Sequence, residues 1–192
     1  ATLMIGNSAM ATPMFAIKDV SGSSGGTPDR GSVHGWDFVS STDITVTELG
    51  LWDENDDGMS ISHDIGIFDS FGVLLASGTI SSGTGDTLID HFRYVDITDI
   101  LVTTGASYTI AYYSATGSSD SVITSASTLL LAPEITISNA RWGYAPGLSV
   151  PTNTTNEDRF GPNFMFEVSA VPEPETYAML LAGLGLLGFM AS

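Results

Sequence analysis

Short stretches of alternating apolar and polar residues, separated by small turn residues, run from about residue 15 to residue 171. Clear examples are residues 44–46, 108–112 and 164–168. Because successive side chains of a strand point to opposite faces, such alternation indicates half-buried strands. No segment within this region shows the period of about 3.6 residues that marks an amphipathic helix. The pattern therefore predicts an all-β domain.

A β-hairpin is predicted where residues 65–68 and 73–76 flank the tetrad Asp69-Ser70-Phe71-Gly72, because aspartate and serine favour turns and glycine can take positive φ. Several strands separated by such turns favour a two-sheet antiparallel β-sandwich or jelly roll. Gly50, inside a regular run, is expected to mark a β-bulge. Residues 21–35 and 146–158 are expected to be loops because they are rich in Gly, Ser, Pro, Asn and Thr.

The 192 residues leave room for one such domain with short appendages. The chain has no cysteine, which excludes disulfide bridges and thiolate chemistry. Its 22 acidic and 5 basic residues give a net charge of −17, which excludes nucleic acid as a partner because phosphate binding needs clustered Lys and Arg. Either the acidic residues only keep a secreted domain soluble, or some of them bind divalent cations.

The two ends differ from the middle of the chain. Residues 1–11 are small and apolar and close with Ala9-Met10-Ala11, the A-x-A form that signal peptidases cleave. They are interpreted either as a signal-peptide remnant or as an N-terminal strand, which leaves residues 12–170 for the β-sandwich domain. At the other end, Pro172-Glu173-Pro174 precedes an uncharged apolar run over residues 178–192. Proline fixes φ and lacks a donor, so the triplet predicts a hinge before a hydrophobic C-terminal helix.

Residues 171–192 closely resemble the PEP-CTERM sorting signal, in which Pro-Glu-Pro, a hydrophobic helix and a basic cluster are recognised by exosortases of Gram-negative bacteria that make exopolysaccharide. The first two parts are present, while no basic cluster follows in this sequence. The resemblance implies that Pro172, Glu173 and Pro174 form the sorting motif, that an exosortase is a partner, and that the protein is extracellular or at the cell surface. The apolar run falls short of the roughly 20 residues that span a bilayer, so only transient membrane contact is expected.

Four segments are also similar to the secreted β-sandwich domains of the DUF4082 type. They are ELGLWDENDDGMSISHDIGIFDSFGVLLASGTI from residue 48, FRYVDI from 92, SYTIAYY from 107 and FGPNFMF from 160. The resemblance implies a sandwich fold and an exported location, and it brings no assigned chemistry.

A calcium-loop pattern begins at Asp53. Counting Asp53 as position 1 puts Asn55 at 3, Asp57 at 5, a glycine at 6 and Asp64 at 12, and calcium takes about six to eight oxygen ligands. The spacing predicts a structural Ca²⁺ held by Asp53, Asn55, Asp57 and Asp64. Against this, aspartate is shorter than the usual glutamate at position 12, and the flanking segments look like strands. The alternative is an acidic turn without an ion.

An enzyme is not expected. His34, His63 and His91 are far apart, no G-x-S-x-G motif is present, and His63 is expected at a strand edge. Aromatic side chains either build a sugar-stacking face or fill the core. The six concerned are Trp36, Trp52, Tyr112, Tyr113, Trp142 and Tyr144.

These observations predict a non-catalytic structural protein of the cell surface or biofilm matrix. Because the apolar run would leave a large apolar surface in water, it is expected to join copies of the chain into an extracellular filament. The alternative function is a calcium-dependent matrix lectin or adhesin that binds exopolysaccharide.

Overall fold

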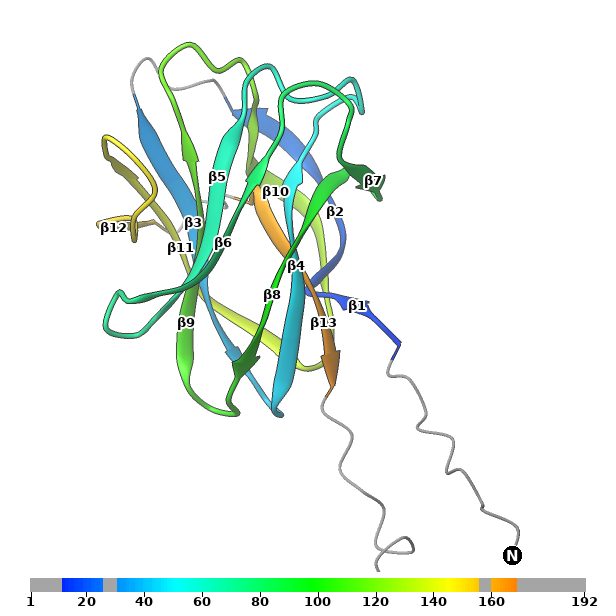
Figure 1. Cartoon of the computed structure of the whole chain (residues 1–192), viewed down its shortest axis with the longest axis vertical. Coiled ribbons are helices and arrows are strands. Elements are labelled where there is room, and N and C mark those ends of the chain that lie inside the picture. Colours follow the sequence, from blue (N-terminus) through cyan, green and yellow to red (C-terminus); the bar gives the residue numbers. More distant parts are fainter. Residues whose placement is uncertain (1–11, 26–30, 156–159, 169–192) are drawn as a thin grey trace, which may run out of the picture.

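A computed structural model of the chain describes residues 12–25, 31–155 and 160–168. Every regular element in these ranges is a β-strand, so the predicted all-β class is confirmed (Figure 1). The expected C-terminal helix and the alternatives for residues 1–11 lie outside the described residues. Within the described ranges, no helix is long and apolar enough to cross a membrane.

The domain consists of two antiparallel sheets and a two-stranded ribbon (Figure 1). The five-stranded sheet has the order β1 (Met14–Phe15), β13 (Pro162–Val168), β4 (Ile44–Trp52), β8 (Phe92–Val102) and β7 (Thr87–Ile89). The six-stranded sheet has the order β12 (Asn153–Thr155), β11 (Ile135–Tyr144), β3 (Ser32–Ser40), β9 (Ser107–Ser114), β5 (His63–Asp69) and β6 (Leu74–Ile80). The ribbon pairs β2 (Ile17–Gly25) with β10 (Val122–Leu131).

Part of the predicted loop at residues 21–35 is wrong, because residues 21–25 continue β2 and residues 32–35 begin β3. The Gly- and Ser-rich segment becomes a strand because β10 pairs with it along its length. A Cβ atom at Gly22 would collide with the backbone of Ser125, so the small residues that suggested a loop permit close strand pairing instead.

Aromatic side chains from both sheets fill the core. Trp36 is fully buried, stacks on Phe164 with ring centroids 5.7 Å apart, and donates a hydrogen bond from Nε1 to the carbonyl of Pro162 at 2.8 Å. Phe38 lies 4.8 Å from the Phe164 ring. Trp36 and Tyr112, two of the six aromatics considered for a sugar face, are therefore core residues.

Gly50 lies in a regular part of β4, so the bulge expected there is wrong. The irregularity in the β4–β8 pairing lies between Val46 and Glu48. A Cβ atom at Gly50 would collide with the ring of Tyr94, and this close approach explains the glycine. The hydroxyl of Tyr94 accepts a 2.9 Å hydrogen bond from the amide nitrogen of buried Asn163.

The predicted hairpin is confirmed as β5 and β6, and Gly72 has φ +79° in the turn between them. Strand β4 runs the length of the sandwich and defines its two ends. At the exit end, Ile44 pairs with Val168 and Val102, and Val168 is the last described residue before the sorting motif. At the far end, beyond Trp52, loop residues 53–62 meet residues 115–121 (Figure 1).

Candidate functional site

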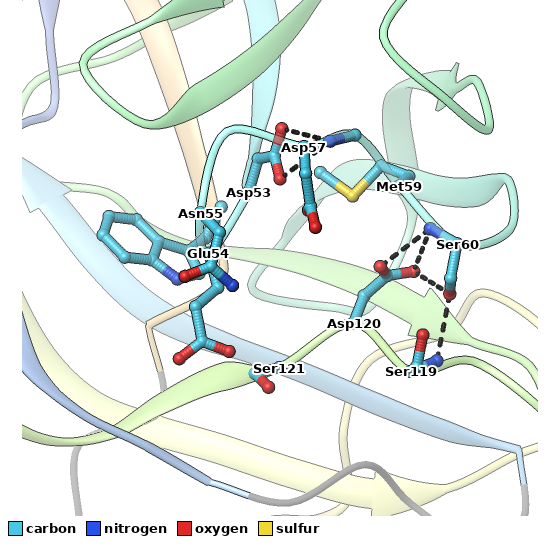
Figure 2. Close-up of a pocket in the computed structure, with 11 residues that line it drawn as sticks. Asp53, Glu54, Asn55, Asp57, Met59, Ser60, Ser119, Asp120 and Ser121 are labelled. Carbon is cyan, nitrogen blue, oxygen red and sulfur yellow. Dashed lines mark hydrogen bonds between the residues drawn. The ribbon is translucent and has the colours of Figure 1, made fainter.

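The far end contains a pocket of about 320 Å³ between the loop that follows β4 and the loop that precedes β10 (Figure 2). Its lining is mostly oxygen-bearing side chains. It comprises Trp52, Asp53, Glu54, Asn55, Asp57, Gly58, Met59, Ser60, Ser119, Asp120 and Ser121. Four carboxylates therefore lie around one small opening.

The loop from Asp53 to Gly58 curls tightly, as its sequence predicts. Asp53 is buried, and its carboxylate accepts hydrogen bonds of 3.0 and 3.2 Å from the backbone N–H of Gly58 (Figure 2). Asn55 and Asp56 have φ of 135° and 61°, and Gly58 has φ +99°. A Cβ atom at Gly58 would lie 2.6 Å from the backbone of Gly83, so both conformation and space require glycine there.

Arg93 on β8 binds this loop and the neighbouring residue Asp86. Its Nε donates to Oδ2 of Asp53 at 2.7 Å, Nη1 donates to the carbonyl of Asp86 at 3.1 Å, and Nη2 donates to the carbonyl of Asp56 at 3.2 Å. The Arg93 and Asp53 side chains are 3% and 2% exposed, so the ion pair is shielded from water. A guanidinium therefore supplies positive charge to the loop by binding one carboxylate and two backbone carbonyls.

The predicted calcium ligands are only partly brought together. Asp53, Asn55 and Asp57 line the pocket, whereas Asp64 lies on β5, where it accepts a 2.8 Å hydrogen bond from the Thr79 hydroxyl. In the ranges that the structure describes, no group of three or more His, Asp or Glu side chains is arranged to hold a metal ion. Calcium bound by the predicted set would have to share the Asp53 carboxylate with Arg93 and Gly58, and Asp64 would have to reach it from β5. Calcium binding stays a prediction.

His63 and Asp120, whose side chains are 0% and 13% exposed, form a second pair at the pocket. His63 is fully buried, its Nε2 lies 2.7 Å from Oδ2 of Asp120, and its Nδ1 lies 3.0 Å from the carbonyl of Tyr113. A carbonyl can only accept, so Nδ1 carries a hydrogen. His63 is the first residue of β5, as the expected strand-edge position implies, and its ring packs 5.6 Å from that of Tyr112.

Ser60 completes the arrangement around Asp120. Its hydroxyl donates to Oδ2 of Asp120 at 2.7 Å, and its backbone N–H donates to Oδ1 at 2.8 Å (Figure 2). Burial raises the pKa of Asp120, but the hydrogen bonds from His63 and Ser60 outweigh burial and hold the pKa well below its usual range. Asp120 is therefore an ionised carboxylate fixed by donors on two sides.

The spatial order of Ser60, Asp120 and His63 decides whether they could act as a nucleophilic catalytic site. Activation of a serine nucleophile requires the imidazole to stand between the hydroxyl and the carboxylate. Here the carboxylate of Asp120 stands between Ser60 and His63, so the hydroxyl donates to the carboxylate and not to the ring. The geometry suits a hydrogen-bonded clamp between the loops better than nucleophilic catalysis.

Two central residues of this end escaped the sequence reasoning. Arg93 lies between the buried residues Phe92 and Tyr94. An arginine flanked by apolar residues on a strand needs an acidic partner when it is buried, and this position in the sequence could have pointed to the ion pair. Asp120 lies in the Ser-rich segment 118–121, which carries no motif. Its contacts with Ser60 and His63 arise only from the fold.

The comparisons with known proteins concern both parts of the chain. Residues 23–161 match the family described as "Domain of unknown function (DUF4082)", and residues 170–192, which contain Pro172, Glu173 and Pro174, match the PEP-CTERM protein-sorting motif. No curated protein is similar enough to the chain to count as a relative. The sorting motif marks substrates of exosortases that Gram-negative bacteria export to the cell surface or extracellular space. The chain thus belongs to the DUF4082 family and is an exported protein with a PEP-CTERM sorting motif.

Proposed function

We propose that this exported protein is a non-catalytic structural component of the cell surface or biofilm matrix, and that its copies join through the apolar segment 178–192. The observation that carries the proposal is an exposed apolar strip at the start of β6. This strip consists of Val73, Leu74 and Leu75, which are 56%, 46% and 38% exposed. Three consecutive large apolar residues on the surface of a strongly acidic domain indicate a contact surface.

The strip lies on an edge strand. Strand β6 is the last strand of the six-stranded sheet, so one side of its backbone is not paired within that sheet. Its later part packs against β8, since a Cβ atom at Gly78 would lie 2.7 Å from Cγ1 of Val95. A register shift opposite Ile67 and Phe68 interrupts the pairing at Leu75. Only the first few residues of β6 are thus open to a partner.

The partner of the strip in this proposal is segment 178–192 of a second copy. That segment is apolar and uncharged, so it can approach a domain of net charge −17 without the repulsion that two such domains exert on each other. The sorting motif begins shortly after Val168, the last described residue at the exit end. A tail leaving one copy and docking on another is a head-to-tail contact, and such contacts extend into fibres where they do not close.

The non-catalytic part of the proposal is supported by the far end of the sandwich. Both ring nitrogens of His63 are occupied, and Asp120 separates this ring from the Ser60 hydroxyl. Arg93 likewise makes three contacts that hold loops together. These groups act on one another, which supports a structural role for the polar network.

Electron microscopy and light scattering on purified protein test the proposal. We expect fibres from the full chain and monomers from a variant that lacks residues 178–192. The double variant Val73→Ser/Leu75→Ser should also remain monomeric, because it removes two of the three apolar side chains of the strip and leaves the tail intact. The matched control is Leu101→Ser, which removes a leucine that is 56% exposed on β8 and should leave fibres unchanged. Fibres that persist after the tail is deleted would contradict the proposal, as would a monomeric full chain.

A further inference from the structure

A second pocket, of about 490 Å³, lies on the outer face of the six-stranded sheet, away from the polar network described above. Strands β3, β9 and β11 supply its floor, and the β5–β6 turn and the segment that joins β11 to β12 supply its walls. The two walls meet where Val150 lies next to Gly72, since a Cβ atom at Gly72 would lie 3.7 Å from Cγ2 of Val150. The pocket is therefore assembled from five parts of the chain.

The floor is an aspartate held by three side chains. Asp37 is 4% exposed, and its carboxylate accepts from the Thr109 hydroxyl at 2.7 Å, from Nδ2 of Asn139 at 3.1 Å and from Nε of Arg141 at 2.6 Å. Nη1 of Arg141 donates to the carbonyl of Pro151 at 3.3 Å. These bonds fix the polar groups in place before any ligand arrives, which reduces the entropy lost on binding.

The floor still offers hydrogen bonds to a ligand. The Arg141 side chain is 26% exposed, and within the described ranges no residue accepts a hydrogen bond from its Nη2. The hydroxyl of Thr109 donates to Asp37 and keeps its own lone pairs as acceptors. Ser70 and Ser107 add two further hydroxyls to the lining. The lining thus offers both donors and acceptors to a ligand.

An aromatic ring stands at the rim. Phe71 is 90% exposed, more than any other large apolar side chain in the described part of the chain. Its backbone is fixed, because Oδ1 of Asp69 accepts hydrogen bonds of 2.9 Å from the N–H groups of both Phe71 and Val73. The turn closes further through a 3.0 Å bond from the N–H of Gly72 to the carbonyl of Asp69. A rigid turn therefore holds the ring in water beside the pocket.

We propose that this pocket binds a unit of a neutral saccharide. A sugar ring has an apolar C–H face, which the phenyl ring of Phe71 can cover, and hydroxyls that both donate and accept, which match Arg141, Asp37 and the lining hydroxyls. Arg141 and Asp37 cancel each other's charge, and the domain as a whole carries −17, so a polyanionic saccharide would be repelled. The site uses no metal ion, and it adds a ligand to the structural role proposed above.

The test is calorimetric titration of the full chain with neutral oligomers of glucose, mannose, galactose and N-acetylglucosamine, and with oligogalacturonate as the anionic arm. We expect at least one neutral oligomer to bind and oligogalacturonate not to bind. Phe71→Ser should weaken that binding at least tenfold. Leu130→Ser is the matched control, because Leu130 is 54% exposed on β10, and it should leave the affinity unchanged. Arg141→Gln should also weaken binding and still allow one hydrogen bond to Asp37.

Several outcomes would overturn the inference. These are silence with every neutral oligomer, preference for oligogalacturonate, or neutral binding that Phe71→Ser leaves intact. The result is independent of assembly, since the strip variant Val73→Ser/Leu75→Ser should lose fibres and keep saccharide binding. A variant at Phe71 that binds no sugar should still form fibres. Each proposal can therefore fail without the other.

Discussion

Within the described ranges, Arg93 and Arg141 each form an ion pair with a buried aspartate, but their surroundings differ. Arg93 and Asp53 are 3% and 2% exposed, and Arg93 is enclosed by the carbonyls of two loops at the far end. Arg141 is 26% exposed beside Asp37, and the outer-face pocket opens onto the pair. The enclosed pair clamps acidic loops that would otherwise repel each other, whereas the open pair presents a fixed polar surface to solvent. The same two residue types thus serve cohesion in one region and recognition in the other.

The largest effect should come from breaking the enclosed pair. We expect Arg93→Met to lower the free energy of unfolding by about 3–5 kcal/mol, because it leaves the Asp53 carboxylate buried without its partner. Arg141→Met should cost only about 1–2 kcal/mol, since Asp37 keeps the hydrogen bonds from Thr109 and Asn139 and the Arg141 side of the pair is open to water. Urea denaturation of both variants measures the difference. Equal losses would show that enclosure does not distinguish the pairs.

The backbone of the clamped loop should also be sensitive. We expect Gly58→Ala to cost about 2–3 kcal/mol, because the residue has φ +99° and its Cβ would meet the backbone of Gly83. Gly85→Ala is the matched control, since no atom lies within 4 Å of a Cβ there, and it should change stability by less than about 0.5 kcal/mol. Thermal unfolding of the two variants provides the comparison. A loss at position 85 as large as that at 58 would contradict the tight loop geometry.

Acid should weaken the far end through Asp120. The folded-state pKa of Asp120 lies below its unfolded value of about 3.9, so its contribution is complete above pH 5 or so and is lost as the pH falls through the folded pKa. We expect Asp120→Asn to lower stability by about 1–2 kcal/mol at pH 7 and by less in acid, because the unfolded parent chain then binds a proton at Asp120 and the folded carboxylate stabilises the fold by less. Denaturation between pH 7 and pH 2 measures this. The stability of the exposed control Asp99→Asn should depend on pH as the parent's does. If the stability of Asp120→Asn also followed the parent's pH dependence, the stabilising role given to the Asp120 carboxylate would be wrong.

The smallest effect should come from calcium. Because Asp53 is held by Arg93 and Asp64 lies on β5, the loop offers calcium an incomplete set of ligands. The tightest binding we expect has a dissociation constant on the order of 10⁻³ M. Millimolar calcium should then raise the free energy of unfolding by about 1 kcal/mol or less. Thermal unfolding with calcium and with chelator checks this. A much larger rise in the free energy of unfolding would mean that calcium displaces Arg93 from Asp53. The variant Asp57→Asn should then abolish that rise.

Local features of the fold could be predicted from the sequence, and contacts across it could not. The β5–β6 hairpin follows from four turn residues, and the curl of the loop from Asp53 to Gly58 follows from its Asp, Asn and Gly content. The cation that closes this loop could not be foreseen, because Arg93 reaches it from 40 residues away. Residues 21–25 of β2 are wrongly predicted as a loop for the same reason, since the pairing with β10 decides their conformation. Phe71 looked like a turn residue, and only the fold shows it at a pocket rim.

The contrast between an enclosed and an open ion pair can be tested most directly by nuclear magnetic resonance of the arginine Nε–H groups during titration with the neutral oligosaccharide panel. Both side chains should give sharp signals, because each Nε–H is hydrogen-bonded to a carboxylate. We predict that a neutral oligosaccharide shifts the Arg141 signal and leaves the Arg93 signal in place. A shift of the Arg93 signal alone, or no shift of either signal, would contradict the account.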